Sequence, residues 1–313
     1  MQAVFLDKGT FSDGVDLPAP TGISDYITYD DTASDPEAII ERCKDAEIII
    51  ANKVKITADT ISRLPNLKLI QLTATGMDNV DQDACDQHGV TLYNVAGYAV
   101  KSVPEHTFML MLSAMRAGLH YHNKAIDGSW QDDGNFCLLD IPLIDLEDKT
   151  LGIIGVGTIG KRVTEIARAF GMTVLWAEHQ GRTPRNDDYT AFDEVLARSD
   201  VLSLHCPLND HTKHLINKNT LAKMTNKPLI VNVARGGVVD SQALTDAINN
   251  EQIIGYASDV FEQEPIVDND PLLSIAHHPR VIFSPHNAWG SKSAQEILWQ
   301  ILSKQVADFI SQH

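Results

Sequence analysis

Short apolar runs alternate with helical patterns in the first third of the chain. Four runs have the length and composition of buried strands: Ala3 to Leu6, Glu47 to Ala51, Leu67 to Leu72 and Val90 to Asn94. Between them, apolar residues recur at helical spacing in three stretches, around Pro36 to Cys43, Thr57 to Leu64 and Asp81 to Gln87. This alternation predicts a small α/β unit with a parallel sheet.

A single long helix is expected next, from about Val103 to His120. Pro104 suits its first turn, and Gly118 stands near its end. Its apolar residues cover nearly all faces: Phe108, Met109, Leu110, Met111, Leu112, Ala114 and Met115. A helix that is apolar all round is buried, so we expect it to lie between domains or against a second subunit. A homodimer is therefore one hypothesis.

From Leu151 onward, the pattern predicts a second series of strands and helices. Six strands are expected: Leu151 to Ile154, Thr173 to Ala177, Val201 to His205, Leu229 to Val233, Ile254 to Asp259 and Val281 to Ser284. A complete dinucleotide-binding domain consists of two mononucleotide-binding halves and has six strands with helices between them. The predicted number of strands agrees with such a domain.

The final helix, from about Ser291 to Ile310, is left over from this count. We expect it to cross back and pack on the first domain, which makes that domain discontinuous. The expected domains are residues 1–100 with 287–313, and residues 101–286. Two crossings between domains would form a hinge, with a substrate enclosed in the cleft.

A glycine-rich turn opens the second series. The stretch LGIIGVGTIG places Gly155, Gly157 and Gly160 between a short strand and a helical pattern. The first glycine permits a tight turn, the second lets backbone approach a pyrophosphate, and the third lets helix and strand pack closely. Unpaired N–H groups at the start of the helix then face the phosphates. Glu178, about 20 residues on, ends the next strand and could accept hydrogen bonds from the adenosine ribose.

Composition and charge narrow the class of protein. The 313 residues suffice for two domains, and 43% hydrophobic with 21% charged residues is typical of a globular protein. No apolar run reaches the ~18 residues that span a bilayer, and no signal-peptide pattern opens the chain, so the cytoplasm is expected. The net charge of −17 argues against nucleic-acid binding. Four scattered cysteines are typical of free thiols in a reducing compartment: Cys43, Cys85, Cys137 and Cys206.

Polar side chains at the predicted strand ends are the candidates for chemistry, because ligands of open α/β sheets bind outside the carboxyl ends of the strands. Arg235 follows LIVNV and could hold a substrate carboxylate or form a structural salt bridge. His286 could transfer a proton, and Glu264 could orient its imidazole and favour the protonated form. Taken alone, His286 could be a satisfied core histidine and Glu264 a solvated loop acid. Together with the glycine turn, they predict reduction of a 2-oxo acid by hydride from a nicotinamide.

Other chemistries have less support. Two groups of histidines lack a strong zinc-ligand pattern: His120 with His122, and His205 with His211 and His214. No metal is therefore expected. No G-x-S-x-G motif supports a serine nucleophile. Cys206, at the end of the third strand of the second series, is expected to line the nucleotide pocket rather than act as a nucleophile.

Seven motifs, in order along nearly the whole chain, resemble the D-isomer-specific 2-hydroxyacid dehydrogenase family. They are TATGMDNVD (73–81), SVPEHT (102–107), GVGTIG (155–160), SLHCPLNDHTKHLIN (203–217), VNVARGGVVD (231–240), GYASDVFEQEP (255–265) and SPHNAWGS (284–291). The resemblance implies an α/β fold of two Rossmann-like domains, with a doubly wound NAD-binding domain inserted in a discontinuous, flavodoxin-like substrate domain. It also implies a homodimer that binds NAD and a small 2-oxo or 2-hydroxy acid.

The resemblance further implies roles for individual residues. Arg235, Glu264 and His286 would form the catalytic trio, with Arg235 on the substrate carboxylate. Residues that border the dinucleotide would be Thr75, Gly155, Gly157, Thr158, Ile159, Gly160, Glu178, Cys206, Pro207, Val233, Ala234 and Asp259, the last at the nicotinamide. The substrate would also contact Gly76, Met77 and Trp289.

Within the family, HNAWGS with Trp289 and the AEHQG run after the second nucleotide strand are most similar to glycerate dehydrogenases, also called hydroxypyruvate reductases. Trp289 could instead be plain core. Glu178 stands where the family usually has aspartate and disfavours a 2′-phosphate by like charge. Arg182 and Arg185 follow closely, so NADH is the expected cofactor and NADPH use stays open.

Three other functions also stay open. A D-lactate-type dehydrogenase of wider specificity is closely related. A phosphoglycerate dehydrogenase fits less well, because Gln71 to Thr75 contains no arginine for a phosphate, although Lys53 and Lys55 could approach an anion. A protein of a different class, an NAD-sensing corepressor-like scaffold, could retain the same trio.

Overall fold

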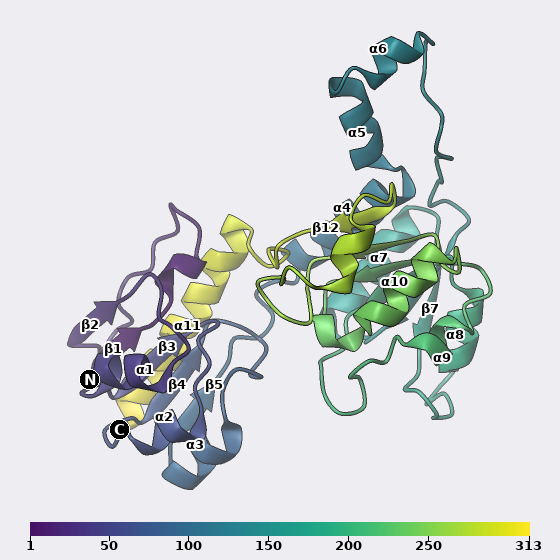
Figure 1. The fold of residues 1–313 in the computed structure, drawn as a ribbon. Coiled ribbons are helices and arrows are strands. Elements are labelled where there is room, and N and C mark those ends of the chain that lie inside the picture. Colours follow the sequence, from purple (N-terminus) through teal and green to yellow (C-terminus); the bar gives the residue numbers. More distant parts are fainter. The chain divides into compact units, whose positions relative to one another are not determined.

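The computed structural model describes residues 1–313 and divides into two compact units (Figure 1). Residues Met1–Ala99 and Trp289–His313 form the first unit, and Val100–Ala288 form the second. Each unit is built around one parallel β-sheet with helices between the strands, as expected of an α/β protein.

The first unit contains a five-stranded sheet in the order β2-β1-β3-β4-β5. Its strands are β1 (Gln2–Phe5), β2 (Asp25–Thr28), β3 (Ile48–Ala51), β4 (Leu69–Leu72) and β5 (Thr91–Tyr93), all paired in parallel. This is the flavodoxin-like order, in which the direction of winding reverses between β1 and β3. The expectation of four strands was wrong, because β2 is a short edge strand without the apolar run that marks its buried neighbours.

Four helices belong to the first unit: α1 (Pro36–Cys43), α2 (Ala58–Ser62), α3 (Gln82–His88) and α11 (Lys292–Gln312). The first three begin at side-chain caps, in which Asp35, Thr57 and Asp81 accept a backbone N–H from the first turn. The terminal helix α11 packs on this unit through Trp299. Its indole ring stacks on Phe5 with 5.6 Å between centroids and donates to the carbonyl of Pro18 at 3.1 Å.

The second unit contains a seven-stranded sheet in the order β12-β11-β10-β9-β6-β7-β8. Its strands are β6 (Thr150–Ile154), β7 (Thr173–Ala177), β8 (Tyr189–Thr190), β9 (Val201–Leu204), β10 (Leu229–Asn232), β11 (Gly255–Ser258) and β12 (Val281–Phe283). Counted from β6, this is the doubly wound order 3-2-1-4-5-6 with one further strand, and winding reverses between β6 and β9. The expected count of six was wrong, because β8 is only two residues long and carries no apolar run.

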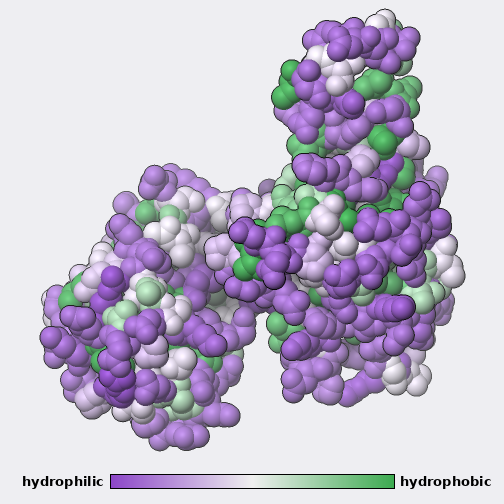
Figure 2. Space-filling view, viewed as in Figure 1, coloured by the Kyte–Doolittle hydropathy of each residue, from purple (hydrophilic) through white to green (hydrophobic).

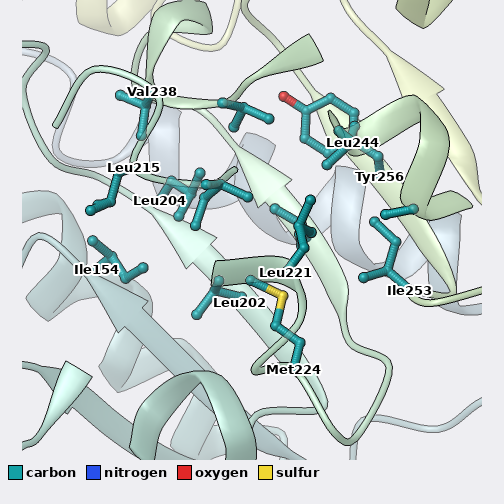
Figure 3. Packing of buried hydrophobic residues seen from close by; sticks show 14 of the residues in the cluster. Ile154, Leu202, Leu204, Leu215, Leu221, Met224, Val238, Leu244, Ile253 and Tyr256 are labelled. Atoms are coloured by element: carbon teal, nitrogen blue, oxygen red, sulfur yellow. The ribbon is translucent and has the colours of Figure 1, made fainter. Parts of the chain in front are cut away.

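Buried apolar side chains fill one face of this sheet (Figure 3). Leu202 and Leu204 of β9 meet Leu221 and Leu244 from α9 (Lys218–Leu221) and α10 (Ser241–Asn249). The second unit also contains α7 (Thr158–Ala169), α8 (Phe192–Arg198) and two 3-10 turns, η2 (Gly236–Val238) and η3 (Pro271–Ile275). This core holds the carboxyl ends of the strands in fixed register.

The single helix expected from Val103 to His120 is two helices, α4 (Ser102–Met115) and α5 (Gly118–Ile126). The chain breaks at Ala117, which has a positive φ of 47°. The buried guanidinium of Arg280 donates to the carbonyls of Ala114 and Met115, at 3.0 and 2.8 Å, and so satisfies the last turn of α4. Most apolar residues of α4 are buried inside the second unit, although Met109 stays 44% exposed.

Residues 118–143 form an arm that extends from the body of the second unit (Figure 1). It contains α5 and α6 (Ser129–Asp133) and returns to the body alongside α5, where the Tyr121 hydroxyl donates to the carbonyl of Ile141. Figure 2 shows hydrophobic residues on the surface of this arm. Six of its large hydrophobic side chains are exposed: Leu119, Ile126, Trp130, Phe136, Leu139 and Leu143. None of the helices has the length and apolar character needed to cross a bilayer.

Candidate active site

The glycine turn of the second unit has three glycines with three different surroundings. Gly155, at φ +95°, lies so close to the chain after β9 that a Cβ would stand 2.4 Å from the Cys206 nitrogen. A Cβ on Gly160 would stand 2.4 Å from the Gly155 carbonyl oxygen. Gly157, immediately before α7, has open space around it, with no atom within 4 Å of a Cβ position. Of these three glycines, Gly157 is the one whose backbone, next to the N-terminus of α7, is accessible to a phosphate group.

A cavity of about 580 Å³ lies at this edge of the sheet, where winding reverses between β6 and β9. It brings together five of the residues expected at the cofactor: Gly155, Gly157, Glu178, Cys206 and Pro207. Tyr189, Phe192 and Leu215 add apolar surface to its wall. Burial raises the pKa of the Cys206 thiol to about 11, so this thiol stays protonated and lines the cavity as a small apolar side chain.

Glu178 is buried and accepts four hydrogen bonds within the second unit. Arg185 donates to it from Nε at 2.8 Å and from Nη2 at 2.5 Å, and the backbone N–H groups of His179 and Arg185 donate as well. The guanidinium of Arg185 also lies over the ring of Tyr189. The hydrogen bond from the Arg185 side chain is the main reason that the pKa of Glu178 lies well below its ordinary value. Sequence reasoning noted Arg185 only as a nearby cation and missed this bidentate pair.

His286 and Glu264 form a hydrogen-bonded pair beyond the ends of β12 and β11. The distance from Nδ1 of His286 to Oε2 of Glu264 is 2.6 Å. Glu264 is held in turn by the backbone N–H of Phe261, which donates to its other oxygen at 3.0 Å. Both side chains keep solvent contact, with 20% of His286 and 31% of Glu264 exposed. The pair can therefore exchange a proton with a bound molecule.

Arg235 follows β10, where Asn232 holds the backbone. The Asn232 amide donates to the carbonyl of Arg235 at 3.1 Å, and its oxygen accepts the N–H of Ala234. The next residue, Gly236, lies against the backbone of Phe261, where any Cβ would overlap its carbonyl carbon at 1.9 Å. This close contact packs the Arg235 turn on the segment that leads to Glu264. Asn232 was not predicted from the sequence to hold this turn, since a buried asparagine in a strand gives no local signal.

Asp259 lies at the end of β11 with its carboxylate buried and directed at the turn that carries His286. It accepts N–H groups from Asn287 and Ala288 at 3.0 and 2.9 Å, and the hydroxyl of Ser284 at 2.6 Å. Nε2 of His106 lies 3.4 Å away. Burial raises the pKa of Asp259, but the hydrogen bonds from His106, Ser284 and Ala288 outweigh this effect and hold it below its ordinary value.

The other expected site residues are distributed over both units. Thr158 and Ile159 open α7, whereas Val233 and Ala234 follow β10. The first unit contains Thr75, Gly76, Met77 and Trp289. There, Thr75 donates to the carbonyl of Val95 at 2.8 Å, and Trp289 packs edge-to-face against Phe11 and Tyr98. No group of three or more side chains suited to a metal ion occurs in the structure.

Residues 108–288 match the family model described as D-isomer specific 2-hydroxyacid dehydrogenase, NAD binding domain. The chain is 40% identical to a glycerate dehydrogenase of Methylorubrum extorquens, over 99% of this chain and 96% of that protein. It is 32% identical to a hydroxypyruvate reductase of Blautia hydrogenotrophica, over 99% and 97% of the two chains. A D-lactate dehydrogenase from Aquifex aeolicus, solved with NAD and lactic acid, superposes with a TM-score of 0.84 at 29% identity, over 99% of this chain and 96% of that one.

Proposed function

The chain belongs to the D-isomer-specific 2-hydroxyacid dehydrogenase family, and we propose that it reduces hydroxypyruvate or glyoxylate to D-glycerate or glycolate. It is an NAD(H)-dependent oxidoreductase that acts on CH–OH groups. The choice of substrate is supported by the glycerate dehydrogenase and hydroxypyruvate reductase relatives, which align over nearly the whole chain.

Proton transfer is assigned to His286. Because its Nδ1–H donates to Glu264 at 2.6 Å, Nε2 is the ring nitrogen that can hand a proton to a carbonyl oxygen. Glu264 fixes the orientation of the ring and provides the negative charge beside it. The 2.6 Å pair, set at the ligand-binding edge of a sheet with a glycine turn, is the observation that carries this assignment.

Arg235 is assigned to the substrate carboxylate. A planar guanidinium matches a carboxylate through two parallel hydrogen bonds and can polarise the adjacent carbonyl. The turn that carries Arg235 is packed against the segment leading to Glu264, which favours a fixed guanidinium. When bound, NADH supplies the hydride that adds to the carbonyl carbon, while the proton from His286 completes the hydroxyl group. The assignments of Gly76, Met77 and Trp289 to the substrate stay predictions.

The cofactor fits the residues present. The open space at Gly157 suits a pyrophosphate, the start of α7 provides N–H donors, and the apolar wall of the 580 Å³ cavity suits an adenine ring. Glu178 lies at the end of β7, where a ribose would approach. Thr158 and Ile159 are expected at the phosphates, and Val233, Ala234 and Asp259 toward the nicotinamide.

The substrate assay is direct. NADH oxidation is followed by absorbance with hydroxypyruvate, glyoxylate, pyruvate and 3-phosphohydroxypyruvate in parallel, and repeated with NADPH. Hydroxypyruvate or glyoxylate should lead. A pyruvate-led profile would replace this assignment by the D-lactate type, and a lead for 3-phosphohydroxypyruvate would contradict both. Tight NADH binding without turnover of any oxo acid would favour an NAD-sensing scaffold.

We also propose that two copies of the chain associate as a homodimer through the arm. Six large apolar side chains are exposed on residues 118–143, and exposed apolar surface that is gathered in one place is typical of protein interaction sites. Phe136 is 96% exposed, and a self-complementary contact between two arms would cover it. Light scattering should give twice the chain mass for the wild type and a lower mass for Phe136→Lys; a wild-type monomer at micromolar concentration would contradict the proposal.

A further inference from the structure

His286 has a backbone conformation that needs support. Its φ of +50° lies in the left-handed region, which residues with a Cβ rarely adopt outside turns. The conformation fixes the direction in which the imidazole leaves the chain, and therefore the position of the proton donor assigned above. The structure must supply contacts that hold this turn.

Asp259 supplies the first set of contacts. Its backbone carbonyl accepts the N–H of His286 at 2.8 Å, and its carboxylate accepts the next two N–H groups, from Asn287 and Ala288. Three consecutive N–H groups of the turn therefore end on one residue, which is only 1% exposed. A rotation of this carboxylate would release the turn.

Helix α4 supplies the second set, through two residues one helical turn apart. The hydroxyl of Ser102 donates to the carbonyl of Ala288 at 2.6 Å. Nε2 of His106 lies 2.8 Å from the hydroxyl of Ser284. Residues i and i+4 face the same side of a helix, so α4 contacts both ends of the segment 284–288, with His286 in the middle.

The direction of these hydrogen bonds is set by Asp259. Its ionised carboxylate can only accept, so the Ser284 hydroxyl uses its hydrogen on Oδ1 at 2.6 Å. The Ser284 oxygen is then an acceptor, and His106 must carry a hydrogen on Nε2. The chain of donors therefore runs from His106 to Ser284 to Asp259, and Asp259 holds the turn.

We propose that His106, with Ser102, is a positioning residue for the proton donor: it holds Ser284 and Asp259 in the orientation that keeps His286 in its left-handed conformation. The inference rests on the proposed function of His286 for its effect on turnover. It does not require His106 to touch the substrate or the cofactor. Ser102 and His106 belong to the SVPEHT motif and have no role in the active site assigned above. The positioning role gives a reason for both residues.

The test compares His106→Ala, His106→Gln, Ser284→Ala and Ser102→Ala in the full-length chain with NADH and the oxo acid that turns over best. His106→Ala should lower kcat by about tenfold to a hundredfold, because small misplacement of a catalytic group has effects of this size. NADH affinity, measured by fluorescence titration, should change little. Glutamine keeps a donor near the Nε2 position, so His106→Gln should recover most of kcat.

Coupling between the two contacts gives a further check. The double variant His106→Ala with Ser284→Ala should lose no more than the stronger single variant, because both act through Asp259. Thr107→Val is the matched control on α4: its buried hydroxyl donates only within the helix, to the carbonyl of Val103 at 2.8 Å. It should leave kcat unchanged.

A readout independent of turnover keeps the two proposals separate. Nitrogen-15 NMR of the histidine rings, with His286 assigned by its substitution, should show a shift of the His286 signals in His106→Ala and Ser102→Ala but not in Thr107→Val. Unchanged His286 signals and unchanged kcat in correctly folded His106→Ala would overturn the inference. Shifted signals in a protein that turns over no oxo acid would leave the positioning role standing and refute the proposed function instead. If His106→Ala fails to fold, His106→Gln and Ser102→Ala carry the same measurements.

Discussion

The two sheets have the same kind of crevice and fill it differently. Each is parallel, and each reverses its winding between two neighbouring strands, β1 and β3 in the first unit and β6 and β9 in the second. Open α/β sheets bind ligands at such a point. In the second unit, the glycine turn leaves an open cavity there, with free space at Gly157.

In the first unit, the chain's own carboxylate lies at this point. Asp7, just after β1, accepts the N–H groups of Asn52, Lys53 and Val54, which follow β3, at 2.6 to 3.2 Å. Asp7 is only 2% exposed, and burial raises its pKa although the three backbone donors act in the opposite direction. The same fold thus provides an anion-binding position twice, and local sequence decides whether a ligand or a side chain takes it.

Gly155→Ala should have the largest effect on the stability and NADH binding of the second unit. A Cβ at this positive-φ position would overlap the Cys206 backbone at 2.4 Å, so we expect a loss of unfolding free energy above about 2 kcal/mol and no measurable NADH binding. Gly157→Ala is the control, because its Cβ meets no protein atom. It should keep the melting temperature and weaken NADH binding about tenfold or more, ~1.4 kcal/mol. Equal melting temperatures for the two variants would contradict the account.

Asp7→Ala should destabilise the first unit without affecting the cofactor site of the second. It leaves the backbone N–H groups after β3 without their acceptor, and unsatisfied buried donors have effects of about 1–3 kcal/mol each. We expect urea unfolding to show a loss of about 2–4 kcal/mol, with NADH affinity unchanged in the folded protein. A loss under about 0.5 kcal/mol would mean that water replaces the carboxylate freely.

Lowering the pH should destabilise the second unit through His205, which follows β9. Burial lowers its pKa from 6.5 to about 4. Between these values the unfolded chain binds a proton that the folded chain does not, so the free energy of unfolding falls as the pH drops from 6.5 toward 4. The contribution is on the order of 1–3 kcal/mol. Thermal melts of His205→Asn should show a shallower decline over this pH window than the wild type; parallel curves would remove His205 as the cause.

Arg185 and Glu178 should shift cofactor preference in opposite directions. Arg185→Gln leaves the Glu178 charge without its partner and should raise the ratio of kcat/KM for NADH over NADPH, whereas Glu178→Gln should lower it. Each change should be about tenfold, ~1.4 kcal/mol. Steady-state kinetics with both cofactors measures the ratio, and a shift of both variants in the same direction would exclude the pair as its determinant.

Sequence patterns predict the buried elements well and the edges poorly. The buried strands and the strand-end positions of Arg235 and His286 follow from apolar runs, and the glycine turn follows from the spacing of its glycines; both signals are local. The edge strands β2 and β8 lack such runs. The break after α4 depends on Arg280, more than 160 residues away, and no local pattern marks it.

Like the edge strands, the contacts that support the candidate site could not be predicted from the sequence. His106 and Ser284 lie 178 residues apart in the chain, and the Asp7 carboxylate accepts N–H groups from residues 45 to 47 positions later. The bidentate geometry of Arg185 requires the fold of the loop after β7. A sequence motif indicates the residues that contact a ligand. The residues that hold those side chains in place depend on tertiary packing, which a local motif does not contain.

We propose that His286, paired with Glu264, donates the proton in a reduction by NADH. The most direct measurement is turnover of hydroxypyruvate by His286→Ala, together with NADH affinity of the same variant. We expect kcat to fall about a hundredfold to ten-thousandfold, with NADH bound as tightly as by the wild type. Turnover retained at the wild-type rate would contradict this proposal.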